Sequence, residues 1–287
     1  YKESLNPNFA GAVSLYVKDT TSYSKYKKKI QIISSDDFNN KSELFRNKNY
    51  IINFCKKFKK NKDAIKIIEI HNRPEYLTYI KNYFPNTKIQ LVFHNDPLSL
   101  RGSISYEERD KILKSCHKVV FISSWIQQRF FTSFKNADLS NSIIIPHGIK
   151  KISKINLINK QKNILFVGKL NHAKGYHIFA DAALKFKKKN PEWNFIAIGN
   201  EARKNIFPDK KIITEIGYKK NSEVLNFYSK SEIAIGNSVW DEPLGRIAIE
   251  ASSRKCLPII SNKGGLAESK NIALVLKKNT SNELYKI

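Results

Sequence analysis

Residues 164–175 read ILFVGKLNHAKG, and this stretch decides the fold of the second half of the chain. Its first four residues, Ile164–Val167, form the continuous apolar run that is typical of a strand buried on both faces. Gly168 allows a tight turn directly after that run. The apolar spacing over Gly175–Lys189 is then typical of a helix. A buried strand that leads through a glycine turn into a helix predicts an α/β unit with a parallel sheet.

The same alternation continues in both directions along the chain. Short apolar runs predict strands at Ile65–Ile70, Ile89–Phe93, Val119–Ile122, Ile143–Ile145, Ile164–Val167, Phe195–Ile198, Ile212–Ile216, Glu232–Ile235 and Leu257–Ile260. Between them, we expect helices at Ser42–Lys60, Pro74–Phe84, Tyr106–Ser115, Ser124–Phe134, Gly175–Lys189, Ser222–Lys230 and Leu244–Arg254. The polar, basic stretch Lys150–Lys162 indicates a linker. The sequence thus predicts an α/β chain of two Rossmann-like, doubly wound parallel-sheet domains, residues 1–150 and 151–287, facing a cleft.

Length and composition agree with two α/β domains and exclude several other classes. The chain has 287 residues, of which 41% are hydrophobic, too many for a disordered chain. Its three cysteines, Cys55, Cys116 and Cys256, are too scattered for a disulfide framework or a zinc site and fit a reducing compartment. No apolar run approaches the about 18 residues that span a bilayer. Because the chain starts at Tyr1 and contains no methionine, we expect a fragment. We expect truncation at both ends, because residues 5–11 indicate a loop where a strand normally opens such a domain, and a new helical pattern begins at Ser281 just before Ile287.

The formal net charge is +26, from 51 basic and 25 acidic residues. Residues 1–150 hold 26 of the basic and 13 of the acidic side chains, so the excess is spread evenly and marks no tail. One interpretation is a solvated lysine surface from a codon-biased genome, and another is affinity for an anionic membrane or an acidic substrate. No nucleic-acid recognition motif accompanies the charge, so we expect no nucleic-acid partner.

Two lysines flank the glycine turn at residues 164–175. Lys169 and Lys174 lie where α/β domains bind phosphate, and two ammonium groups can neutralise a diphosphate without a metal ion. Neither a Walker A loop nor a G-x-G-x-x-G fingerprint is present. The alternative interpretation is an ordinary loop in a lysine-rich chain.

A second motif, SVWDEPLGRIAIEA, occupies residues 238–251. Pro243 is typical of the start of a helix, which places Glu242 just before it and Glu250 about two turns into it, on roughly the same side. Two carboxylates can accept hydrogen bonds from sugar hydroxyls. The alternative is that one glutamate is an ordinary helix-start charge and the other is partly exposed.

A third motif, SNKGGLAE at residues 261–268, follows the apolar run Leu257–Ile260. Its paired glycines, Gly264 and Gly265, either expose backbone N–H groups to a ligand or make a tight turn.

In this order and spacing, the three motifs resemble the donor-binding half of the retaining nucleotide-sugar glycosyltransferases of family 4, which have the GT-B fold. The resemblance covers about Asn163–Glu268. The first half is similar more loosely, at Gly11 and at the passage Ser115–Ile149, where His147 replaces the asparagine that is usual in the family.

The resemblance implies a role for each matching residue. Lys169 and Lys174 would hold the donor diphosphate after the turn at Gly168, and Glu250 would bind the ribose. Glu242 would contact the donor sugar, and the backbone N–H groups of Leu244 and Gly245 would lie near the phosphate. Gly11 would let the first loop approach the donor or the acceptor. His94 matches a family histidine near the transferring sugar, although a histidine at the end of a strand is more often a structural residue. His71 ends a strand on the same side and is a candidate for the acceptor side.

The implied enzyme is a metal-independent hexosyltransferase. It needs no cofactor beyond its nucleotide-sugar donor, which would be a UDP-sugar or a GDP-sugar. Its acceptor would be a glycan or lipid-linked molecule in the synthesis of a bacterial surface polysaccharide such as lipopolysaccharide. The enzyme would be cytoplasmic, with peripheral contact to the inner face of the membrane. The basic stretch Asn53–Lys62, with Phe54 and Phe58 one turn apart, is either a membrane-surface helix or an amphipathic core helix.

Two alternatives remain open at this point. One is another GT-B enzyme, such as a sugar-nucleotide epimerase or a phosphorylase. The other is a basic α/β module that docks on an anionic membrane or polyanion without catalysis, which would bind polyanions in a salt-sensitive way and without nucleotide selectivity.

Overall fold

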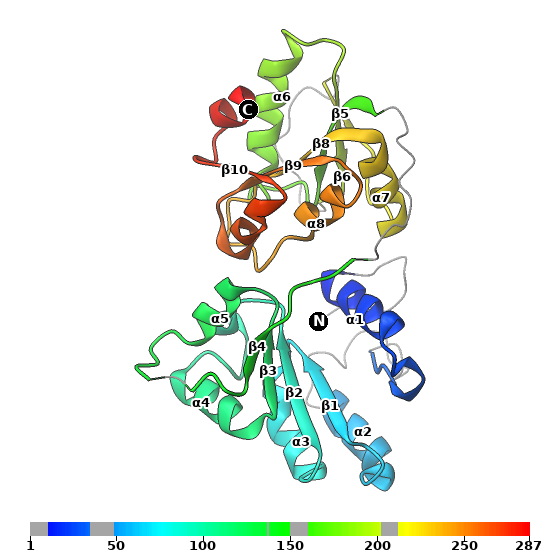
Figure 1. Cartoon of the computed structure of the whole chain (residues 1–287), viewed down its shortest axis with the longest axis vertical. Coiled ribbons are helices and arrows are strands. Elements are labelled where there is room, and N and C mark those ends of the chain that lie inside the picture. The colour runs from blue at the N-terminus through cyan, green and yellow to red at the C-terminus, as the bar shows by residue number, and fades with distance from the viewer. Residues whose placement is uncertain (1–10, 35–48, 137, 150–159, 202–211) are drawn as a thin grey trace. The chain divides into compact units, whose positions relative to one another are not determined.

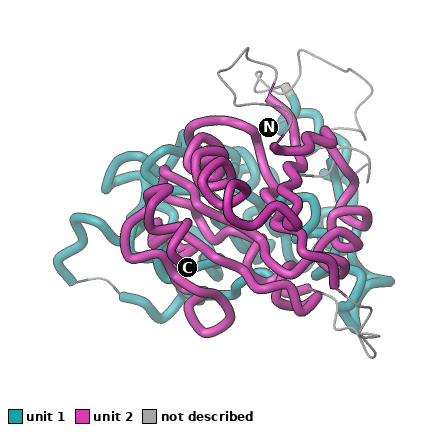
Figure 2. Tube along the Cα trace, turned by 90° about the horizontal axis from the view of Figure 1, so that it is seen from above, with its two compact units in different colours: residues 1–147 teal, residues 148–287 magenta. Residues whose placement is uncertain are grey.

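The computed structural model describes residues 11–34, 49–136, 138–149, 160–201 and 212–287 (Figure 1). The chain divides into two compact units, Tyr1–His147 and Gly148–Ile287, which are coloured separately in Figure 2. None of the described helices is long and apolar enough to cross a bilayer.

Unit 1 contains a four-stranded parallel sheet in the order β1-β2-β3-β4 (Figure 1). The strands are β1 (Ile67–His71), β2 (Lys88–Phe93), β3 (Lys118–Phe121) and β4 (Ser142–Ile144). Leu91 and Phe93 of β2 and Phe121 of β3 are completely buried, as the continuous apolar runs predict.

The helices of unit 1 connect and cover these strands. They are α1 (Ala12–Tyr23), α2 (Asn49–Phe58), α3 (Leu77–Tyr83), α4 (Tyr106–Ser115) and α5 (Ser124–Phe130), with short 3-10 turns η1 (Lys27–Lys29), η3 (Lys59–Asn61), η4 (Pro74–Tyr76) and η5 (Pro97–Ser99). Helices α4 and α5 pack on β3. Helix α4 has the predicted bounds because Ser105 and Glu108 form a capping box at its start.

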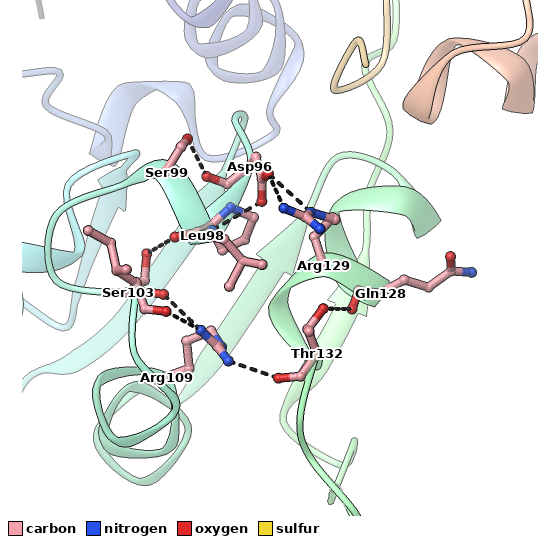
Figure 3. A network of polar contacts seen from close by, with 10 residues as sticks. Asp96, Leu98, Ser99, Ser103, Arg109, Gln128, Arg129 and Thr132 are labelled. Atoms are coloured by element: carbon pink, nitrogen blue, oxygen red, sulfur yellow. Dashed lines mark hydrogen bonds and ion pairs between the residues drawn. The ribbon is translucent and has the colours of Figure 1, made fainter. Parts of the chain in front are cut away.

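A polar network holds the loop that follows β2 (Figure 3). The Arg129 guanidinium donates two hydrogen bonds to Asp96 Oδ2, from Nε at 3.0 Å and from Nη2 at 2.8 Å. Arg109 is buried and donates to three backbone oxygens, those of Ser103, Ile104 and Thr132. These bonds join the loop to α4 and α5, so the residues directly after β2 have a defined position.

Unit 2 contains a six-stranded parallel sheet in the order β10-β9-β8-β5-β6-β7. The strands are β5 (Gln161–Val167), β6 (Asn194–Ile198), β7 (Ile213–Glu215), β8 (Ser231–Gly236), β9 (Leu257–Ser261) and β10 (Leu274–Leu276). The helices are α6 (Tyr176–Lys187), α7 (Asn221–Lys230), α8 (Arg246–Ser252) and α9 (Ser281–Lys286), and η6 spans Gly264–Asn271. The predicted α/β fold with parallel sheets is confirmed.

The predicted linker, Lys150–Lys162, is only partly within the described residues, because residues 150–159 lie outside them. Its last residues are not a linker. Gln161 and Lys162 belong to β5, and the Lys160 ammonium donates to the backbone oxygens of Tyr228, Ser229, Ser231 and Arg254 at 2.7–3.3 Å. Lys160 thereby fastens the start of β5 to the ends of α7 and α8.

Several local predictions differ from the structure. The predicted helix Ser124–Phe134 ends at Phe130, and of the predicted helix Ser42–Lys60 residues 42–48 lie outside the described residues. Strand β10 was not predicted, although its three residues are apolar and it is as long as the predicted strands β4 and β7. The predicted helix Leu244–Arg254 begins later, at Arg246, with Gly245 as its N-cap. Gly245 has a φ of +78°, outside the helical region, so Pro243 lies in the preceding loop rather than in the first turn.

Candidate functional site

The three motifs of unit 2 meet at the carboxyl ends of β5, β8 and β9, which are neighbours in the sheet. Open parallel sheets bind ligands at this edge. The lysine turn follows β5, the loop that contains Glu242 follows β8, and the glycine pair follows β9. Topology thus brings together Lys174, Glu242 and Gly264, which are 22 to 90 positions apart in sequence.

The turn after β5 is held against the loop after β8 by its backbone. Gly175 has a φ of +76°, and a Cβ atom there would lie 2.0 Å from the backbone oxygen of Asn237. The Asn237 amide donates to the Gly175 oxygen at 2.9 Å, and Val239 N–H donates to the Ala173 oxygen at 2.9 Å. The Lys174 N–H donates to Asn171 Oδ1 at 3.1 Å, which fixes the turn from within. Only glycine fits at position 175 in this arrangement.

The centre of the site is a cluster around the Glu242 carboxylate, here called the Glu242 cluster and made of Lys174, Ser238, Trp240 and Glu242. Ser238 Oγ donates to Glu242 Oε1 at 2.5 Å and Trp240 Nε1 donates to the same oxygen at 2.9 Å. The Lys174 ammonium forms an ion pair with that oxygen and lies 4.9 Å from the centre of the Trp240 ring. Glu242 is buried, so three donors offset the cost of removing its charge from water.

The glycine pair supports the same loop. Gly265 N–H donates to the backbone oxygen of Glu242 at 2.7 Å, and Ser261 Oγ donates to the backbone oxygen of Ser238 at 2.8 Å. Asn279 adds hydrogen bonds from its amide to the oxygens of Asn237 and Ser238, both at 2.9 Å. The loop after β8 therefore has fixed contacts on both sides.

Lys169 and Gly168 lie at the entrance to the turn. Gly168 directly follows β5, and its N–H donates to the Ile198 oxygen at 2.9 Å. The Lys169 side chain is exposed, whereas Lys174 is half-buried. The turn thus carries one lysine that is fixed by Glu242 and one that reaches into solvent.

Glu250 lies in a separate network. It is buried in α8, and its Oε1 accepts from Arg246 Nε at 2.9 Å and from Asn221 Nδ2 at 3.0 Å. Arg246 is one turn earlier on the same helix, and Asn221 is the first residue of α7. Leu244, also buried, and Gly245 connect this network to the Glu242 cluster along the chain.

In unit 1, His94 belongs to a line of side chains here called the histidine chain: Glu69, His71, His94 and His147. Glu69 Oε1 lies 2.9 Å from His71 Nε2, and His71 Nδ1 lies 2.9 Å from His94 Nε2. His94 Nδ1 lies 3.3 Å from His147 Nε2. Both ring nitrogens of His94 therefore have a histidine as hydrogen-bond partner.

Tyr16 of α1 covers the histidine chain. Its ring centre lies 4.8 Å from those of His94 and His147 and 6.0 Å from that of His71. Burial, and then the nearby charge of Glu69, raises the pKa of Tyr16 to about 12. Burial, followed by repulsion from His71 and His147, lowers the pKa of His94 well below its usual 6.5. Gly11, also a predicted site residue, is the N-cap of α1. As a glycine it has no side chain that could join the histidine chain.

Sequence reasoning found Lys174 and Glu242 but assigned no role to several of their partners. Ser238 and Trp240 belong to the quoted motif at residues 238–251 but were given no role of their own. Arg246 and Asn221 were given none either. Tyr16 and Glu69 were also missed: Tyr16 is 55 to 131 positions from the three histidines, and Glu69, although only two positions from His71, lies in an apolar strand pattern that assigns it no role. In the described residues, no group of three or more His, Cys, Asp or Glu side chains could hold a metal ion.

Residues 148–279 match the family model described as "Glycosyl transferases group 1", a range that contains the whole Glu242 cluster and Glu250. The matches support a glycosyltransferase enzyme. Spore coat protein SA of Bacillus subtilis is 25% identical over 238 residues, 72% of this chain and 62% of that protein. The putative glycosyltransferase YtcC of the same organism is 22% identical over 231 residues, 70% of this chain and 56% of that protein.

Solved structures of low identity show the same fold. A glycosyltransferase from Rickettsia africae has a TM-score of 0.67 at 21% identity, with 96% of this chain and 76% of that chain covered. HepE of Anabaena, in complex with UDP-glucose, has a TM-score of 0.61 at 14% identity, with 82% and 70% covered. The chain spans about three fifths of the length of the two curated relatives.

Proposed function

We propose that the chain is a retaining, metal-independent glycosyltransferase of family 4. It would transfer a hexose-type sugar from a nucleoside-diphosphate sugar to a hydroxyl group of a glycan or lipid-linked acceptor in surface polysaccharide synthesis. The observation that carries this proposal is the Glu242 cluster, in which a turn lysine and a buried carboxylate are held together at the ligand-binding edge of a parallel sheet.

Lys174 is the residue to which we assign the donor diphosphate. An ammonium group has three N–H donors, and the pairing with Glu242 uses one of them. The side chain keeps 29% of its exposure, so the other donors can reach phosphate oxygens. Lys169, which is exposed next to the strand end, adds a second positive charge. The positive charge of the two lysines stabilises the negative charge that grows on the leaving diphosphate.

Glu242 is assigned to the donor sugar. Among the described residues its three hydrogen bonds all go to Oε1, which leaves Oε2 as the acceptor for a sugar hydroxyl. Because Ser238 and Trp240 fix the carboxylate before a ligand arrives, little ordering is needed on binding.

The remaining donor contacts follow the chain from Glu242 to Glu250. Leu244 and Gly245 would offer backbone N–H groups to the phosphates, and Gly168 would let the nucleotide approach the end of β5. Glu250, held by Arg246 and Asn221, would accept hydrogen bonds from the ribose. We assign the acceptor side to unit 1, with His94 and Gly11 as its candidate residues.

In the proposed reaction, the bond from the anomeric carbon to the diphosphate oxygen breaks, and a bond to the acceptor oxygen forms on the same face. The leaving phosphate takes the proton of the acceptor hydroxyl. The electron pair of the broken bond remains on the diphosphate, where the lysines stabilise it. A UDP-sugar is the favoured donor because HepE of Anabaena was solved with UDP-glucose and with UDP.

The test is release of nucleotide from UDP-glucose and GDP-mannose with excess EDTA present. We expect one of the two donors to be consumed, and the sugar product observed first by NMR to have the anomeric configuration of the donor. Inversion would contradict the retaining mechanism, and loss of turnover with EDTA would contradict metal independence. A folded chain that releases neither nucleotide would contradict the transferase assignment.

An anionic membrane is the partner that the surface of unit 1 favours. Residues 23–32, here called the basic segment, read YSKYKKKIQI and contain four lysines and no acid. Tyr23, Tyr26, Ile30 and Ile32 are all exposed, at 62%, 56%, 41% and 36%. Apolar side chains among lysines are typical of segments that lie at the surface of an anionic bilayer. The enzyme would then work at the cytoplasmic face of the membrane.

Helix α2, which also combines lysines with aromatic residues, offers a matched control. Phe54 packs on Phe58 and on the buried Phe84, with ring centres 5.1 and 6.2 Å apart, so its aromatic residues face the core rather than a membrane. We expect K27Q/K28Q/K29Q to reduce cosedimentation with phosphatidylglycerol vesicles by at least tenfold. The charge-matched K56Q/K57Q/K60Q should have a smaller effect. Equal effects would show that net charge, and not the basic segment, drives binding.

A further inference from the structure

The histidine chain of unit 1 is not explained by donor binding. Its members gather at the carboxyl ends of three strands: His71 is the last residue of β1, His94 is the first residue after β2, and His147 follows β4. The exposure falls along the chain, from 41% for the Glu69 side chain and 17% for that of His71 to 4% for His94. One end of the chain thus meets solvent and the other is buried.

The hydrogen bonds of this chain have a direction that chemistry fixes. A carboxylate only accepts, so the proton between Glu69 and His71 is on His71 Nε2. In a neutral His71 the other nitrogen, Nδ1, then has a lone pair and accepts from His94 Nε2–H. His94 Nδ1 is in turn left as the acceptor for His147 Nε2–H. The charge of Glu69 therefore selects the tautomer of a histidine two bonds away.

The backbone holds the rings in this line. Asn72 has a φ of +53°, and its Oδ1 accepts from the N–H groups of His94 at 2.7 Å and Asn95 at 3.2 Å. This joins the end of β1 to the end of β2 directly beside the two histidines. The ion pair between Asp96 and Arg129 fixes the next turn of the same loop. The backbone from which the His94 ring enters the histidine chain is therefore fixed.

We propose that Glu69 and His71 are positioning residues that hold His94 as the neutral Nε2–H tautomer in one ring orientation. The same geometry also defines a protonated state. With one proton added, His71 carries N–H on both nitrogens, and His94 and His147 carry theirs on Nδ1. Each of the two histidine–histidine bonds keeps its partners and reverses its donor. A change of protonation at the exposed end is thus transmitted to the buried ring.

Two other side chains contact members of the histidine chain, Gln90 and Tyr16. Gln90 donates to Glu69 Oε2 at 2.6 Å and orients that carboxylate. Tyr16 contacts all three rings, and with a pKa of about 12 its hydroxyl stays neutral. Arg73, two residues after His71, forms an ion pair with Glu75 at 3.6 Å. Glu69 is therefore the carboxylate that sets the direction of the hydrogen bonds.

The first experiment is NMR of the whole chain labelled with ¹⁵N-histidine, at pH 7.5. We expect a scalar coupling across the hydrogen bond between His71 Nδ1 and His94 Nε2, with the proton bonded to His94. In Glu69→Gln, the amide can donate as well as accept, so the two ¹⁵N shifts of His94 should move toward each other. Glu75→Gln removes a nearby carboxylate outside the chain and should leave them unchanged. Absence of the coupling, or a Glu69→Gln spectrum like that of the wild type, would overturn the proposal.

The second experiment rests on the proposed function and measures turnover. We expect Glu69→Gln to lower kcat about 10-fold, with KM changed less than twofold, and to shift the acidic limb of the pH profile. Glu69→Asp, which restores the carboxylate, should recover part of kcat. An unchanged kcat and pH profile in Glu69→Gln would mean a purely structural chain and would also overturn the proposal. If the wild type transfers no sugar, the function proposed above fails. The NMR result alone then decides whether Glu69 and His71 hold the tautomer of His94.

Discussion

Lys174 and Glu242 are 68 positions apart in sequence, yet the ammonium of one pairs with the carboxylate of the other. The pair joins the turn after β5 to the loop after β8, and Ser238 and Trp240 complete the coordination of the carboxylate. A buried carboxylate with three donors on one oxygen is costly to assemble, and the surrounding backbone bonds keep it in place. The pair is the feature on which the proposed donor site depends.

Glu242→Gln tests the role of the carboxylate. Glutamine has nearly the same shape and still accepts from Ser238 and Trp240, so we expect a folded protein. The lost charge should lower kcat/KM about 100-fold, which is the size of effect seen when one stabilising group is removed from a transition state. Steady-state kinetics of donor turnover measure this. Glu192→Gln, which removes a carboxylate at the surface of the same unit, is the control and should retain wild-type kinetics.

Gly175→Ala tests the contact between the two loops. The φ of +76° and the approach of the Asn237 oxygen to 2.0 Å from a Cβ position both oppose a side chain. We expect a loss of about 2 kcal/mol in unfolding free energy and weaker nucleotide binding. Gly148→Ala adds a methyl group where no atom lies within 4 Å and should be neutral. Equal urea midpoints for the two variants would show that the contact contributes nothing.

Arg246→Met tests the network of Glu250. Removing one partner leaves a buried carboxylate with less compensation, so we expect a loss of about 3 kcal/mol in unfolding free energy. The double variant R246M/E250Q should recover much of that stability, because the buried charge is gone. Nucleotide affinity should fall in both variants. A double-mutant cycle without a coupling energy would contradict the pairing.

The lowered pKa of His94 predicts that the unfolding free energy of unit 1 depends on pH. Burial and the two neighbouring histidines hold its pKa well below 6.5 in the folded chain, so below pH 6.5 the unfolded chain binds a proton that the folded chain does not. Stability is therefore fully present above pH 6.5 and falls as the pH decreases through it, by at most about 1.4 kcal/mol per pH unit. Urea unfolding at pH 7.5 and 5.5 measures this. His94→Gln should reduce the dependence, whereas replacement of the exposed His117 should not.

Much of the fold could be predicted from the sequence, because buried parallel strands are continuous apolar runs and the helices between them are periodic. Predicted and observed strands such as Val119–Ile122 and β3 differ by about one residue. The later start of α8 could not be predicted, because it depends on the φ of Gly245 rather than on apolar spacing.

The candidate site was predictable only in part. The turn lysine and Glu242 stand in motifs, so their proximity follows from the order of strands in the sheet. The histidine chain could not be predicted in this way. His71, His94 and His147 lie at the ends of three different strands, and the hydrogen bonds between them depend on how each ring is oriented. No spacing in the sequence encodes that orientation.

The most direct test of the donor site is calorimetric titration of UDP into the wild type, Lys174→Ala and Lys188→Ala in the presence of EDTA. Lys188 is an exposed lysine at the end of α6 and serves as the matched control. We expect saturable binding of one UDP per chain, at least tenfold weaker binding in Lys174→Ala, and unchanged binding in Lys188→Ala. If the wild type and Lys174→Ala bind UDP equally well, or if both lysine variants lose affinity equally, the proposed role of the Lys174–Glu242 pair is wrong.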